Sequence, residues 1–211
     1  LGGDGRAWRV FGGHGLRRAA VEPDPEKAGL GFAPPSDQNE GKGGIELNVT
    51  MIPVESDGQI EMVAQLAKII WTEHYAKILS VGQVAYMLKH LQSGEAIREQ
   101  LKGGYRYYLM HFEGQDVGYL AIKPEEGQLF LSKIYVLKAF RNQGIATRAL
   151  AYLTGLCKDE GWGKIWLTVN KNNTGSIAAY EKRGFVKART QVEDIGEGYV
   201  MDDYIMEKIV D

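Results

Sequence analysis

The segment formed by residues 129–150 constrains the fold more than any other part of this chain. It reads LFLSKIYVLKAFRNQGIATRAL, which is an apolar stretch ending at Val136, a short polar turn, and a helical pattern that begins near Gln143. A buried strand that enters a helix through a short turn is half of a βαβ unit, and residues 165–169 form the next predicted strand. The inward-facing helical stripe is predicted to be Ala146, Ala149, Leu150, Leu153 and Leu156.

The rest of the chain from residue 45 onward alternates regular elements with glycine-containing turns. Further strands are predicted at 45–54, 105–112, 117–122, 128–136, 185–191 and 199–209, and helices at 60–74, 81–101, 143–160 and 174–183, with a candidate break at Ser93-Gly94. Antiparallel strands with one βαβ crossover indicate an α+β fold. We expect mixed αβα layers, in which helices cover both faces of a mostly antiparallel central sheet.

Residues 1–44 differ in composition from the remainder. They are rich in glycine, proline and charge and show no sustained apolar period, so they are expected to be a low-complexity, flexible extension before a domain at 45–211. Because the chain begins with Leu rather than Met, one hypothesis is that this extension does not belong to the native product.

Composition argues against several classes of protein. Of 211 residues, 44% are apolar, and the formal net charge of −2 gives no reason to expect binding to nucleic acid or to an anionic membrane. Cys157 is the only cysteine, and the four histidines lack metal-ligand spacing, so neither a disulfide nor a metal site is predicted. No apolar run reaches the length of about 20 residues that a bilayer requires, and the N-terminus lacks the pattern of a secretory signal, so we expect a cytoplasmic protein.

The polar turn before the third predicted helix is a candidate anion site. A helix start leaves several backbone N–H groups unpaired and carries about half a unit of positive charge. Gly144 and Ala146 have no bulky side chains, so a ligand can approach the main chain, and Arg141 could add a charge-assisted contact. Pyrophosphate is the natural occupant of such a site.

Residues 141–146, Arg-Asn-Gln-Gly-Ile-Ala, resemble the Gln/Arg-x-x-Gly-x-Gly/Ala signature of the GNAT acetyltransferase superfamily. The block from Val169 to Phe185 is similar to the second motif of that family, and the resemblance in element order extends over residues 45–211. It implies an acetyl-CoA-binding βαβ crossover, N-acetyltransferase activity, acetyl-CoA as co-substrate and no metal.

The resemblance also implies roles for individual residues. Tyr180 occupies the position of the tyrosine that protonates the departing CoA thiolate, although an aromatic that only packs its helix is an alternative. Asn173 can cap the helix that starts near residue 174, and the resemblance implies that it also contacts the CoA arm. Independently of the resemblance, main-chain amides at the end of the strand at 134–136 could polarise the thioester carbonyl, which requires no particular side chain. The implied cofactor-binding residues are Ile134, Val136, Arg141, Asn142, Gln143, Gly144, Ile145, Ala146, Thr147 and Asn173.

The base that deprotonates the acceptor amine is not evident from the sequence. Some family members carry a glutamate on the strand before the phosphate turn, but residues 131–134 read Leu-Ser-Lys-Ile here. The candidates are Glu73, His74, Asp202 and Asp203, each of which could equally be a structural or solvated charge.

The leading functional hypothesis is direct attack by a primary amine on acetyl-CoA in a ternary complex. The alternatives are a non-catalytic CoA-binding regulatory module and a plain interaction domain. The negative balance would suit a small cationic or polyamine-like acceptor, while a protein N-terminus, a lysine and an antibiotic amine stay open, as does a homodimer.

Overall fold

The computed structural model describes residues 48–75 and 78–211. The chain divides into two units, Leu1–Glu46 and Leu47–Asp211, and every described residue belongs to the second unit. The predicted extension at residues 1–44 lies outside the described residues.

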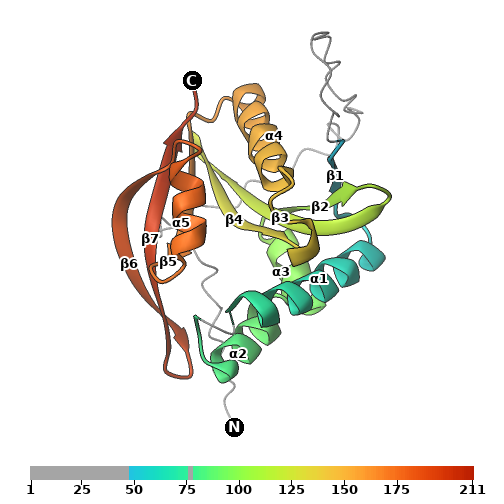
Figure 1. Ribbon diagram of the computed structural model, residues 1–211, viewed down its shortest axis with the longest axis vertical. Helices are drawn as coiled ribbons and strands as arrows, with labels where there is room; N and C mark the ends of the chain where they lie inside the picture. The colour runs from blue at the N-terminus through green and yellow to red at the C-terminus, as the bar shows by residue number, and fades with distance from the viewer. Residues whose placement is uncertain (1–47, 76–77) are drawn as a thin grey trace, which may run out of the picture. The chain divides into compact units, whose positions relative to one another are not determined.

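The described part of the chain forms one seven-stranded sheet with five α-helices. The strands are β1 (Thr50–Pro53), β2 (Arg106–Phe112), β3 (Gln115–Glu125), β4 (Gln128–Val136), β5 (Lys164–Asn170), β6 (Val186–Gly196) and β7 (Tyr199–Ile209). The helices are α1 (Asp57–Tyr75), α2 (Val81–Leu91), α3 (Gly94–Lys102), α4 (Ile145–Glu160) and α5 (Thr174–Glu181), and a 3-10 turn, η2, covers Lys138–Phe140. The strand order is β1-β2-β3-β4-β5-β7-β6, in which β4 and β5 are parallel and all other neighbours are antiparallel (Figure 1). This arrangement confirms the predicted α+β class with a βαβ crossover.

Helices cover both faces of this sheet. Neighbouring residues of a strand point to opposite faces, so the contacts of two adjacent residues identify the helix on each face. Leu120 and Val136 belong to the apolar core that also contains Leu150 of α4. Tyr135, beside Val136, instead contacts the ring of Trp71 from α1, with ring centroids 5.5 Å apart. Helix α4 therefore lies on one face and α1 on the other.

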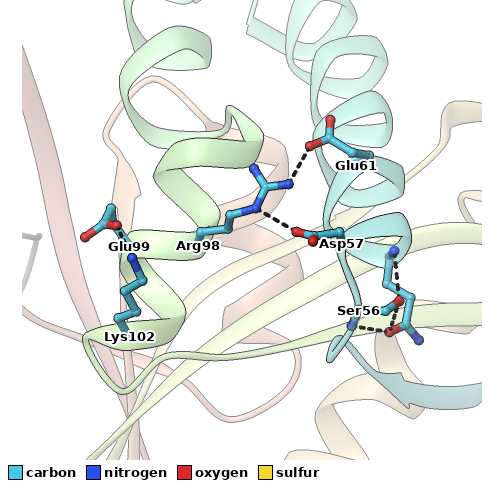
Figure 2. Close-up of polar contacts among 7 residues, drawn as sticks. Ser56, Asp57, Glu61, Arg98, Glu99 and Lys102 are labelled. Carbon is cyan, nitrogen blue, oxygen red and sulfur yellow. Dashed lines mark hydrogen bonds and ion pairs between the residues drawn. The ribbon is translucent and has the colours of Figure 1, made fainter.

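The start of α1 is fixed by two sets of polar contacts. The Ser56 N–H donates to Gln59 Oε1 at 2.9 Å and the Gln59 N–H donates to Ser56 Oγ at 3.4 Å, which is a capping box. Arg98 of α3 bonds to Asp57 at 2.8 Å and to Glu61 at 3.1 Å, as Figure 2 shows. These ion pairs are exposed and contribute little individually, but together with the cap they hold the helix whose last turn carries Glu73, His74 and Tyr75.

Several predicted boundaries differ from the structure, and three of these differences bear on the architecture. The helical stretch 81–101 is two helices, and the break is confirmed at Ser93, whose hydroxyl accepts the Ala96 N–H at 3.2 Å. Of the strand predicted at 45–54, Thr50–Pro53 is β1, and residues 45–47 are outside the described range. Helix α4 begins at Ile145 rather than Gln143, because Gly144 is left-handed, with φ 81°, and precedes the helix.

The predicted inward stripe of α4 was partly wrong. Ala146 and Leu156 are only half-buried, whereas Ile145 and Cys157 are 1% and 0% exposed. The row that faces the sheet follows i, i+4 spacing from Ile145, and Cys157 behaves in it as a small apolar side chain.

Candidate active site

Strands β4 and β5 separate along their length, and this separation defines the candidate site. Their parallel ladder consists of Leu129 opposite Ile165 and Phe130 opposite Trp166. Directly beyond these pairs, Ser132 is an extra residue in β4, since Ala121 pairs with Lys133 while Ile122 pairs with Leu131. A bulge of this kind bends a strand away from its neighbour. The C-terminal end of β4 therefore has an open side, which leads into the turn before α4.

The turn itself has the geometry of an anion site. Asn142 and Gly144 are both left-handed, with φ 64° and 81°. The first intrahelical hydrogen bond of α4 runs from the Arg148 N–H to the Gly144 carbonyl at 3.0 Å, so the N–H groups of residues 145–147 precede the helical ladder. Main-chain N–H groups gathered by left-handed residues at a helix start bind phosphate oxygens. The residues present thus fit a pyrophosphate.

The Arg141 side chain folds back onto the end of β4 and does not extend straight out of the turn. Its Nε donates to the Val136 carbonyl at 2.9 Å. Because the N–H and C=O of one strand residue point to the same side, the Val136 N–H also faces the open side of β4. Arg141 therefore holds the turn against the strand, and its direct contact with a ligand stays a prediction.

The remaining predicted cofactor residues contribute in different ways. Ile145 is buried in the core, so only its main chain can face a ligand. Ile134 packs against that same core, Ala146 is half-buried, and Asn142, Gln143 and Thr147 are exposed. The Gln143 side chain donates to the Ala139 carbonyl at 3.1 Å, which braces the turn.

Arg183 links the two helices that flank the site and was missed by the sequence reasoning. Its Nη2 donates to Thr147 Oγ1 at 2.6 Å, and its Nη1 donates to the Ala179 carbonyl at 2.7 Å. Its Nε is buried without a hydrogen-bond partner among the described residues. Its place one turn after Tyr180, within the second motif, was a usable signal. The guanidinium adds positive charge beside the first turn of α4.

Tyr180 lies on α5, partly buried against the core. Its ring contacts Phe185 edge-on, with centroids 5.5 Å apart. Burial raises the pKa of Tyr180 above its usual range, the Tyr75 phenol adds to this, and Arg183 opposes it. Within the described residues its hydroxyl has no hydrogen-bond partner. The group therefore keeps its proton at neutral pH and can donate it.

The phenols of Tyr75, which is buried, and Tyr135, which is half-buried, form a pair that interacts electrostatically with Tyr180. The hydroxyls of Tyr75 and Tyr135 are 3.0 Å apart. Burial raises the pKa of Tyr75 to about 12 and that of Tyr135 well above its usual range, and Tyr180 raises the latter further. Neither phenol was predicted as a site residue. Strand alternation could have indicated Tyr135, since it points away from Ile134 and Val136.

Asn173 joins the end of α1 to the start of α5. Its Oδ1 accepts the Ser176 N–H at 3.3 Å, which confirms its predicted role as N-cap. Its Nδ2 therefore faces His74 Nε2, 3.1 Å away. Burial, and then the charge of Arg141, lower the pKa of His74, while Glu73 opposes the shift. His74 is thus a neutral acceptor of a hydrogen bond from Asn173.

The three carboxylate candidates for the base occupy different environments. Glu73 forms an ion pair with Lys138 at 2.9 Å, and Asp202 forms one with Lys171. Asp203 is only 7% exposed, and its Oδ1 has no partner within the described residues. Burial raises the pKa of Asp203 to about 6, with Asp202 and Glu193 adding to the shift and Lys171 opposing it. Asp203 alone of the three carboxylates is both buried and left unpaired.

The family model described as Acetyltransferase (GNAT) family matches residues 64–185, which contain the phosphate turn and Tyr180. This chain belongs to the GNAT acetyltransferase family. Among the described residues no helix is long and apolar enough to cross a membrane, and no group of three or more His, Cys, Asp or Glu side chains is placed to hold a metal ion.

Curated relatives with similar sequences are named uncharacterized N-acetyltransferase and come from Mycobacterium bovis and Mycobacterium tuberculosis. They are 30% identical over 95 residues, which is 44% of this chain and 60% of theirs. The match therefore spans less than two thirds of the length of those relatives.

Two solved structures show the same GNAT fold. The PaiA N-acetyltransferase from Thermoplasma acidophilum, in complex with coenzyme A, is 21% identical with a TM-score of 0.63, covering 77% of this chain and 99% of its own. A GCN5-related N-acetyltransferase from Rhodopseudomonas palustris is 16% identical with a TM-score of 0.66, covering 79% and 99%.

Proposed function

We propose that this protein is an acetyl-CoA-dependent N-acetyltransferase that transfers an acetyl group to a primary amine by direct attack in a ternary complex. The observation that carries the proposal is the left-handed turn at Asn142 and Gly144, which presents the N–H groups of α4 beside the open end of β4. Membership of the GNAT family supports the same activity.

Main-chain groups would do most of the binding. The N–H groups of residues 145–147 would hold the pyrophosphate, and Gly144 leaves room for it because it has no side chain. The Val136 N–H, which faces the open side of β4, would bond to the thioester carbonyl oxygen and stabilise the charge that develops there. Asn173 would contact the arm of the cofactor. When bound, acetyl-CoA supplies the activated acetyl group.

Tyr180 would act as the general acid. Its pKa lies above the usual range for a phenol, so the hydroxyl is protonated at any physiological pH. A proton donor next to the leaving sulfur prevents the expulsion of a free thiolate and is expected to accelerate the reaction by about 10²-fold or more.

The acceptor would be a small cationic amine of the polyamine-like class. The unpaired buried carboxylate of Asp203 supports this preference over an uncharged acceptor. It also favours catalysis over a regulatory module, because the carboxylate that is absent from β4 has a substitute on β7.

The test combines binding with turnover. Calorimetry with acetyl-CoA measures binding, and a thiol-release assay with a panel of primary amines measures transfer. We expect binding together with thiol release for at least one amine. Binding without release across the panel would favour the regulatory module, and failure to bind would favour the interaction domain.

We propose further that the protein acts in the cytoplasm and forms a homodimer. Strand β6 is an edge of the sheet, with exposed Val186 and Val192, and could pair with a second copy. Light scattering in solution tests the dimer, and fractionation of the native host tests the compartment.

A further inference from the structure

The buried carboxylate of Asp203 faces the α1 side of the sheet, where β4 and β5 have already separated. Asp203 is in register with Asn170, the last residue of β5, and Tyr204 is in register with Val169. Val169 belongs to the core on the α4 face, so Asp203 points to the opposite face. Tyr135 points to that face too, from the other diverging strand.

Three aromatic rings, those of Trp71, Tyr75 and Tyr135, contact one another on this face of the sheet. The Trp71 ring lies 5.1 Å from the Tyr75 ring and 5.5 Å from the Tyr135 ring, measured between centroids. Burial is the main cause that raises the pKa of Tyr75, and the negative charge of Asp203 adds to the shift. Aromatic faces beside a carboxylate complement an organic cation, since both attract positive charge in a desolvated place.

The Oδ1 atom of Asp203 has no hydrogen-bond partner among the described residues. Lys171, whose charge lowers the pKa of Asp203, forms its ion pair with Asp202 instead. A buried carboxylate oxygen without a hydrogen-bond donor is unfavourable, and native proteins rarely keep one unless it serves a site.

We propose that Asp203 binds the ammonium group of the acceptor, with Tyr75 and Tyr135 lining the subsite, and removes its proton. This inference rests on the proposed function and assigns its acceptor class, a primary alkylammonium. It also assigns the base that the sequence left open.

In the acetyl transfer, two protons leave the ammonium nitrogen, and a C–N bond replaces the C–S bond. Asp203 takes one proton from the ammonium, and the nitrogen lone pair then forms the C–N bond with the acetyl carbonyl carbon while the C–S bond breaks. Tyr180 gives its hydroxyl proton to the sulfur and recovers one from the new amide nitrogen. The proton left on Asp203 is released to solvent with the products.

The pH dependence follows from burial and from the charges that act on Asp203. Burial raises the pKa of Asp203 most, Asp202 on β7 and Glu193 on β6 add to the shift, and Lys171 lowers it, while Tyr75 of α1 stays neutral. The carboxylate is therefore present above about pH 6, and ammonium binding should be lost as the pH falls through that value.

The matched variants are Asp203→Asn and Asp202→Asn, which remove one charge from adjacent residues of β7. Calorimetry measures the binding of 1,4-diaminobutane and of n-butylamine to each protein saturated with CoA, which cannot transfer an acetyl group. We expect Asp203→Asn to weaken binding of both amines at least tenfold, and Asp202→Asn to change it less than threefold. CoA affinity should be equal in all three proteins, which shows that each is folded.

Wild-type protein supplies a second test that needs no variant. Binding of n-butylamine should be at least fivefold weaker at pH 5 than at pH 8. Equal binding at the two pH values, equal binding by Asp203→Asn, or no binding of either amine to the wild type would overturn the proposal. Amine binding without thiol release would instead overturn the acetyltransferase function and leave the ammonium subsite standing.

Discussion

The hydroxyl groups of Tyr75 and Tyr135 lie 3.0 Å apart and join the last turn of α1 to the end of β4. Tyr75 is buried and Tyr135 is half-buried, and both phenols stay protonated at neutral pH because their pKa values are raised. The contact therefore fixes the end of α1 at the place where β4 is bent away from β5. It also brings the two flanks of the candidate site into one hydrogen-bonded unit, with Asp203 and Tyr180 acting on it electrostatically.

Replacing Gly144 by Glu should abolish the binding of acetyl-CoA. Gly144 is left-handed, and a carboxylate there would add strain and place negative charge at the phosphate site. Gly161→Glu is the matched control, since Gly161 is also left-handed, with φ 73°, at the other end of α4. We expect acetyl-CoA to raise the melting temperature of Gly161→Glu but not of Gly144→Glu. A comparable rise in both would refute the phosphate site.

Tyr180→Phe should lower kcat by about 10²-fold and leave CoA affinity nearly unchanged. The substitution keeps the ring against Phe185 and removes only the hydroxyl. Tyr152→Phe serves as control, because Tyr152 lies on α4 and packs against Tyr108, away from the phenol pair. The measurements are kcat with a good amine acceptor and calorimetry with CoA. Near-full kcat in Tyr180→Phe, with acetyl transfer shown to limit turnover, would exclude Tyr180 as the acid.

Arg183→Met should weaken CoA binding by roughly tenfold, which corresponds to the loss of one charge-assisted interaction. The variant severs the contact with Thr147 and removes a positive charge beside the first turn of α4. Arg189→Met is a matched control, because Arg189 is exposed and pairs with Glu207 on the β6–β7 ribbon. Calorimetry compares the two proteins, and identical CoA affinities would mean that Arg183 has only a structural role.

Lys133→Met should stabilise the protein, most strongly near neutral pH and below. Lys133 is 8% exposed, and burial lowers its pKa to about 7. The unfolded chain therefore binds more protons than the native state between about pH 7 and 10, so wild-type stability should rise with pH in that window. The rise should be about 2–3 kcal/mol between pH 7 and 9.5, at about 1.4 kcal/mol for each pH unit above the native pKa.

The control for that prediction is Lys102→Met, which removes an exposed lysine paired with Glu99. Denaturant unfolding at several pH values gives the stability of each variant. The pH-dependent rise should vanish in Lys133→Met and persist in Lys102→Met. A rise of equal size in all three proteins would show that other groups cause it. Loss of stability in Lys133→Met at every pH would show that its bonds to Gln100 and Ser132 outweigh the cost of burial.

Sequence patterns predicted those parts of the site that lie within one short segment of the chain. The phosphate turn depends on Gly144 and the helix that follows it, so a short segment was enough to indicate it. Tyr75 and Tyr135 are 60 positions apart, and His74 and Asn173 are 99 apart. No sequence period relates residues at such distances, which is why the phenol pair was missed.

The choice among the base candidates depended on burial rather than on residue type. Glu73, Asp202 and Asp203 are all carboxylates near apolar segments, and the sequence could not tell them apart. Adjacent residues of one strand point to opposite faces, so Asp202 is exposed and pairs with Lys171 while Asp203 is buried. The side to which each faces follows from the register of β7 against β5, which only the fold specifies.

The short ladder between β4 and β5 has a consequence for how the domain opens. Leu129–Ile165 and Phe130–Trp166 are the only cross-strand pairs between β4 and β5 in the described chain. The sheet therefore has two leaves, β1-β2-β3-β4 and β5-β7-β6, and α4 connects them along the chain. The strand pairs within each leaf have longer ladders than the one between β4 and β5, so one leaf can loosen while the other stays folded. A cofactor that contacts α4, β4 and α5 at once would bind the leaves together. We therefore expect amide exchange to occur separately in the two leaves of the free protein and in concert once acetyl-CoA is bound.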